Sequence, residues 1–109
     1  MSRTLSLFIL LFAAVLEAGG DALVRSSMQA STVTARLCLL TFGAIVLCAY
    51  GYAVNRPPWD FGRVIGIYVV FFFLVAQAIS WVAFNQRPTG PIVVGGAFVV
   101  AGGVIMSMF

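Results

Sequence analysis

The sequence contains no histidine and no lysine, and it has only three acidic residues and two cysteines among 109 residues. Without histidine there is no Ser-His-Asp arrangement, and the few cysteines and acids form no cluster with metal-ligand spacing. A glycine-rich phosphate-binding loop is also missing. We therefore expect no covalent catalysis, no metal and no cofactor, and we do not expect an enzyme.

The net charge of +3 comes from arginines that are scattered singly along the chain. A nucleic-acid-binding surface gathers basic residues into a patch or stripe, so no nucleic-acid partner is expected. The arginines lie instead near the ends of predicted helices, where membrane proteins place charge. These residues are Arg3, Arg25, Arg36, Arg56, Arg63 and Arg87.

The two cysteines, Cys38 and Cys48, lie on one predicted helix. Ten helical residues span about 15 Å, whereas a disulfide needs α-carbons within about 7 Å. They are therefore interpreted as small apolar packing residues that do not bridge within that helix.

Hydrophobic residues make up 62% of the chain and charged residues only 8%. A small soluble domain cannot hide so much apolar surface, but a lipid bilayer removes this problem, because about 20 helical residues cross it. The predicted fold class is an all-α membrane protein with one domain of four transmembrane helices. Their expected ranges are about 4–24, 35–54, 61–84 and 91–108.

The connections are recognised by polar residues and prolines. Residues 25–34 are rich in Ser, Thr and Gln, residues 55–60 contain two prolines that cannot continue a helix, and residues 85–90 form the third turn. The amino-terminal apolar run resembles a signal peptide, but Glu17 interrupts it and no small-x-small cleavage site ends it. We interpret it as a retained first helix.

Short connections require successive helices to be antiparallel, which places three arginines on each side of the membrane. The positive-inside rule then gives no preferred orientation. Either the chain inserts both ways and two copies pair antiparallel, or unequal depth or the terminal amine fixes one orientation.

Glu17 is the main candidate for function, because it falls near the middle of the first helix. An ionisable side chain at that depth is costly and by default marks a functional site. A carboxylic acid there is suited to exchanging a proton for a cation. The alternative is a protonated glutamate that hydrogen-bonds to a neighbouring helix.

Asp21 and Arg25 follow Glu17 at intervals of four residues, so the three side chains share one helix face. Asp21 and Arg25 either form an ion pair at the helix end, or Asp21 attracts cations towards Glu17. Small residues around Glu17 either permit close helix approach or leave space for a ligand.

Tyr68 on the third helix is predicted to face the cavity and to hydrogen-bond to Glu17, and Tyr50 on the second helix is a weaker candidate. An aromatic ring can also hold a cation. Ordinary lipid or core packing is the alternative for both.

The fourth helix has no charge and carries two pairs of glycines seven residues apart, Gly95 with Gly102 and Gly96 with Gly103. Seven residues are two helical turns, so each pair lies on one face and offers a smooth groove to another helix. We predict a dimer interface there, with packing inside one subunit as the alternative.

The pattern resembles the small multidrug resistance (SMR) transporters. The segment from Leu16 to Arg25 is similar to that family's Ala-Glu motif, which has a basic residue eight positions after the glutamate, and Gly96 to Gly103 is similar to its seven-spaced glycine motif. Gly62-Arg63-Val64 followed by Tyr68 is similar to the YnfA-type branch.

The resemblance implies an antiparallel, dual-topology homodimer in the bacterial inner membrane. Glu17 of both copies would bind protons or a cationic substrate in turn. The implied function is proton-coupled export of small cationic, partly hydrophobic compounds. A non-transporting accessory or assembly subunit, which uses Glu17 and Asp21 for assembly, is the alternative.

Overall fold

The computed structural model describes residues 1–108, which form four α-helices and no strand. Each helix is long and apolar enough to cross a membrane, so the all-α, four-helix prediction is confirmed. The helices are α1 (Arg3–Gln29), α2 (Val33–Val54), α3 (Phe61–Phe84) and α4 (Gly90–Met108).

Local hydrogen bonds explain where the helices begin and end. The Ser2 hydroxyl accepts a hydrogen bond from the Leu5 amide at 3.1 Å, and the Thr32 hydroxyl accepts one from the Ala35 amide at 3.1 Å. Both are N-cap contacts, which satisfy amides that have no partner inside the helix. Asn85 ends α3 in the left-handed conformation, with φ of 55°.

Helix α1 continues to Gln29, beyond the expected end near residue 24, and α2 already begins at Val33. The predicted loop over residues 25–34 was therefore too long. The buried Ser27 hydroxyl donates to the Val24 carbonyl at 2.6 Å, so this polar side chain is satisfied within the helix. Arg25 consequently belongs to α1 and lies on the same face as Glu17.

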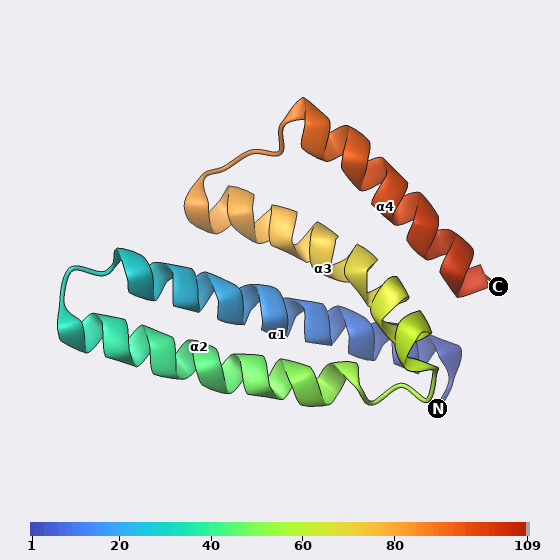
Figure 1. The fold of residues 1–109 in the computed structure, drawn as a ribbon, viewed down its shortest axis with the longest axis horizontal. Coiled ribbons are helices and arrows are strands. Elements are labelled where there is room, and N and C mark those ends of the chain that lie inside the picture. Colours follow the sequence, from blue (N-terminus) through green and yellow to red (C-terminus); the bar gives the residue numbers. More distant parts are fainter. Residues whose placement is uncertain (109) are drawn as a thin grey trace.

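Helices α1 and α2 run antiparallel and side by side (Figure 1). Glycines allow their backbones to come close: a Cβ atom at Gly20 would lie 2.8 Å from Leu47 Cδ2 and 3.3 Å from the Gly43 carbonyl oxygen. Small residues allow such backbone contact between membrane helices. Of the two alternatives for the small residues near Glu17, Gly20 therefore permits close helix approach and does not leave space for a ligand.

The core lies between α1, α3 and the carboxyl-terminal end of α2. Ala13 and Ala14 are completely buried there, which lets bulky residues of α3 approach the α1 backbone. The other core residues are Leu10, Ala53, Val54, Val64, Ile67 and Tyr68.

Within the described residues, the backbone of α4 packs against α3 alone, and Figure 1 shows α4 on the side of α3 away from α2. Gly96 and Gly103 are buried against α3, where they meet Phe73 and Val70. Gly95 and Gly102 have no atom within 4 Å of a Cβ built on them. One glycine pair thus packs inside the chain, and the other pair remains open.

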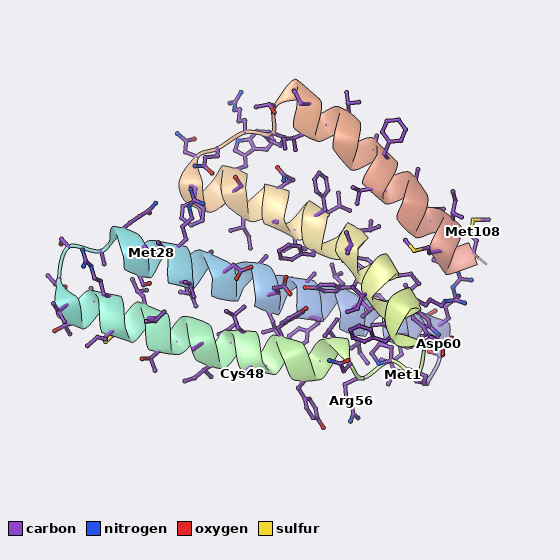
Figure 2. The ribbon with its side chains drawn as sticks, viewed as in Figure 1. Met1, Met28, Cys48, Arg56, Asp60 and Met108 are labelled. Atoms are coloured by element: carbon purple, nitrogen blue, oxygen red, sulfur yellow. The ribbon has the colours of Figure 1, made fainter. Side chains whose placement is uncertain are left out.

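The chain ends are arranged as short, antiparallel connections require. Figure 2 shows Met1, Asp60 and Met108 at one end of the molecule and Met28 at the other. At the first end, Arg3 donates to the Ser107 carbonyl at 2.6 Å and Arg63 donates to the same oxygen at 3.5 Å. Cations at the last carbonyls of a helix are favourable, so the two arginines hold the end of α4.

Candidate functional site

Glu17 lies near the midpoint of α1 and is half-buried. The 27 residues of this helix extend over about 40 Å, whereas the hydrocarbon layer of a bilayer is about 30 Å thick. The Glu17 carboxylate is therefore remote from both helix ends. The sequence likewise predicts Glu17 near the middle of the first helix.

Tyr50 of α2 and Tyr68 of α3 come together beside Glu17. Their ring centroids are 5.5 Å apart and the ring planes are tilted by 35°. The Glu17 carboxylate lies within electrostatic range of both tyrosine hydroxyls. Three candidate residues from three different helices thus form one site.

The Tyr68 hydroxyl is the most unusual polar group in this site. The residue is 3% exposed, and its oxygen makes no hydrogen bond of full geometry within residues 1–108. A buried hydroxyl without a partner costs about 1–3 kcal/mol. Sequence reasoning predicts a Glu17 bond here, and the structure places the two side chains near one another without completing that bond.

Phe72 of α3 adds a third aromatic ring to those of Tyr50 and Tyr68. Its ring centroid is 6.1 Å from that of Tyr68, with the planes 25° apart. Together with Tyr50 and Tyr68 it forms a row of packed aromatic rings next to a carboxylate. Ring faces attract cations, so the combination suits a cation that is partly apolar.

Asp21 lies one turn beyond Glu17 and is exposed, within electrostatic range of the Glu17 carboxylate. The Arg25 guanidinium carbon lies 5.3 Å from the centroid of the Phe84 ring on α3. Arg25 therefore links α1 to the end of α3. Asp21 and Arg25 both line a small pocket between α1 and α3.

Among residues 1–108, two further polar groups are buried without a partner, the Ser6 hydroxyl on α1, which sequence reasoning missed, and Nε of Arg63 on α3, a residue that sequence reasoning names only as an arginine near a helix end and as part of a motif. Ser6, Leu10, Ala13 and Glu17 recur at intervals of four, three and four residues. This spacing places them on one face of α1, so helical periodicity traced backwards from Glu17 identifies Ser6 as a residue of that face. Arg63 stands out by its charge, and its ring partner Trp59 lies four residues before it.

The four glycines of α4 lie apart from this site, on the outermost helix. Among residues 1–108, no group of three or more His, Cys, Asp or Glu side chains comes together in a way that could hold a metal ion. Cys38 and Cys48 are both free and exposed on α2.

No protein-family model, curated protein or solved structure matches this chain. The resemblance to SMR transporters therefore stays a prediction from the residues quoted above.

Proposed function

We propose that this chain is an integral membrane transporter that exports small cationic, partly hydrophobic compounds in exchange for protons. One observation carries the proposal: a glutamate near the middle of a membrane-length helix stands beside a buried tyrosine hydroxyl that lacks a full hydrogen bond. Ionisable residues at such depth mark transport and proton-relay sites in membrane proteins.

The proposed exchange uses the Glu17 carboxylate for two ligands in turn. A proton bound to a carboxylate oxygen leaves the site neutral. Loss of that proton leaves a negative charge, which binds the substrate cation beside the aromatic rings and hydroxyls of Tyr50 and Tyr68. Because proton and cation compete for one carboxylate, inward proton movement is coupled to outward substrate movement.

We further propose that the working unit is an antiparallel homodimer of the SMR type, in the bacterial inner membrane. The outer face of α4 supports this, because Gly95 and Gly102 leave its backbone open to another helix. The arginines support it too, since the end with Arg3 and Arg63 and the end with Arg25 and Arg87 carry similar positive charge. Each copy would contribute one Glu17 to a shared cavity.

The alternative of a non-transporting accessory subunit requires Glu17 to be used for assembly, with Arg25 or Arg63 as its partner. Arg25 lies over Phe84, while Arg63 contacts Ser107 and lies over Trp59. These contacts engage the arginines elsewhere, which favours transport over assembly.

The test is a proton-flux assay with purified protein in lipid vesicles, with guanidinium, tetraethylammonium and tetraphenylphosphonium as probe cations. We expect at least one probe to drive proton movement through the wild type and Glu17→Gln to abolish it. Asp60→Asn is the matched control, because Asp60 is an exposed acid in the turn before α3. Coupled flux that persists in Glu17→Gln, or no coupled flux in the wild type, would refute the proposal.

A further inference from the structure

A small pocket separates α1 from α3 at the end of the molecule that carries residues 85–89. Its volume is about 140 Å³. One carboxylate, Asp21, and one guanidinium, Arg25, face two aromatic residues, Phe72 and Phe84, across it. Ala18 lines its inner wall and is the residue next to Glu17. Phe72 belongs to both the pocket and the site described above, so the two adjoin each other.

The charged residues of α1 stand in a fixed order along the helix. Glu17, Asp21 and Arg25 follow one another at intervals of four on a single helix face. With a rise of about 1.5 Å per residue, Asp21 lies about 6 Å and Glu17 about 12 Å deeper than Arg25 along the helix axis. A molecule that approaches Glu17 from this end meets Arg25 first and Asp21 second.

The Phe84 ring of the pocket is already in contact with a cation of the protein itself, the Arg25 guanidinium. The Arg25 guanidinium carbon lies 5.3 Å from the centroid of the Phe84 ring, within the range of a cation–π contact. The contact joins α1 to the last residue of α3, and both residues line the pocket near the helix ends, at the outer end that we call its mouth. Nearby, the Ser80 hydroxyl lies 3.3 Å from the Gln86 carbonyl oxygen and 3.2 Å from the Gln86 Oε1, and its one proton donates to either of them, which fixes the adjoining turn.

We propose that Arg25 is a tethered cation that closes this mouth, and that a cationic substrate displaces it from Phe84 on the way to Asp21 and Glu17. This inference rests on the proposed function and adds a gate and a specificity element to it. A positively charged group replaces Arg25 over the ring, whereas a neutral molecule has no such attraction to the ring and the acids beneath it. Without substrate, the guanidinium limits the access of water and protons to Glu17.

A structural role for Arg25 makes a different prediction. A cation beside the end of α3 also complements the helix dipole and ties α1 to α3. Loss of that tie would lower stability and leave access to the pocket unchanged in the folded protein. Access must therefore be measured directly.

The experiment labels a single cysteine in the pocket, Ala22→Cys, in a chain whose Cys38 and Cys48 are replaced by alanine. The reagents are a trimethylammonium-ethyl methanethiosulfonate and an uncharged methanethiosulfonate of similar size, applied to vesicles. We expect Arg25→Gln and Phe84→Leu each to accelerate labelling by the cationic reagent by about two- to fivefold, the size of one exposed cation–π contact. Arg25→Lys should stay closer to the wild-type rate.

Arg87 provides the matched control, because its guanidinium lies 5.4 Å from the Trp81 ring centroid at the same end of the molecule but outside the pocket. Arg87→Gln should leave the labelling rate unchanged. Unchanged labelling in both Arg25→Gln and Phe84→Leu, or an equal acceleration in Arg87→Gln, would overturn the gate. Using two gate variants keeps the test decisive if one of them fails to fold.

A transport measurement separates this inference from the function on which it rests. With the gate removed, Arg25→Gln should show a larger proton leak without substrate and a lower KM for a transported probe cation. Wild-type protein without any cation-coupled proton flux would refute the proposed function. Normal coupled flux together with an unchanged leak and KM in Arg25→Gln would refute the gate alone.

Discussion

The contact between α3 and α4 yields a sharp prediction for stability, because Gly103 packs against α3 whereas the neighbouring Gly102 faces away and serves as a control. A Cβ atom built on Gly103 would collide with Val70 Cγ2 and would lie 3.1 Å from Val70 Cβ. Val70 is β-branched, and in a helix such a side chain has one strongly preferred rotamer. It cannot turn aside, so Gly103→Ala forces the two backbones apart.

Overpacking of this kind typically costs about 1–3 kcal/mol, and we expect Gly103→Ala to fall in that range. At Gly96 the obstacle is the far edge of the Phe73 ring, 2.5 Å from the built Cβ atom. A ring edge can swing away about its side-chain bonds, so Gly96→Ala should cost less. In the single chain, Gly102→Ala meets no atom within 4 Å, so for the monomer it should be neutral, or stabilising by up to about 1 kcal/mol through helix propensity.

The free energy of unfolding is measured by titrating dodecyl sulfate into mixed micelles and following helix content by circular dichroism. The expected order of stability is Gly102→Ala at or above the wild type, then Gly96→Ala, then Gly103→Ala. A Gly103→Ala protein as stable as Gly102→Ala would show that this face of α4 does not pack against Val70.

Three further outcomes are expected. Tyr68→Phe should leave the free energy of unfolding unchanged or raise it by up to about 1 kcal/mol, because it removes a buried hydroxyl without a full hydrogen bond. The same variant should lower coupled transport. A variant that loses both stability and transport would show that the hydroxyl is structural. Gly102→Leu should shift detergent-solubilised protein from dimer to monomer without unfolding it, as judged by size exclusion with light scattering, and an intact dimer would place the interface elsewhere. A single cysteine at Ser31, with Cys38 and Cys48 replaced by alanine, should be labelled from both sides of the membrane in similar amounts; labelling from one side only would exclude the antiparallel dimer of identical chains.

The helices and the central acid were predictable because lipid imposes simple rules on sequence. Apolar runs of membrane length and the prolines of residues 55–60 define α3 and the end of α2 at the residues that the structure shows. The polar composition of residues 25–34 misled the prediction for α1, because Ser27 is satisfied by its own helix. Composition does not reveal such a local bond.

Contacts between helices could be predicted only in part. The sequence pairs Tyr68 with Glu17 only as a prediction and offers Tyr50 as a weaker candidate, because the meeting of the two rings beside Glu17 depends on how three helices cross. The glycine spacing on α4 predicts two smooth faces but not which of them meets α3, since Gly95 and Gly96 differ by only one residue. The position of Arg25 over Phe84 likewise depends on where α3 ends.

The central claim is that one carboxylate, Glu17, binds either a proton or a cation. It is tested most directly by measuring proton release from detergent-solubilised protein in weakly buffered solution when guanidinium, tetraethylammonium or tetraphenylphosphonium is added. The wild type should release protons in proportion to the bound cation, Asp60→Asn should behave in the same way, and Glu17→Gln should release none. Undiminished release from Glu17→Gln, or no release from the wild type with any of the three cations, would contradict the claim.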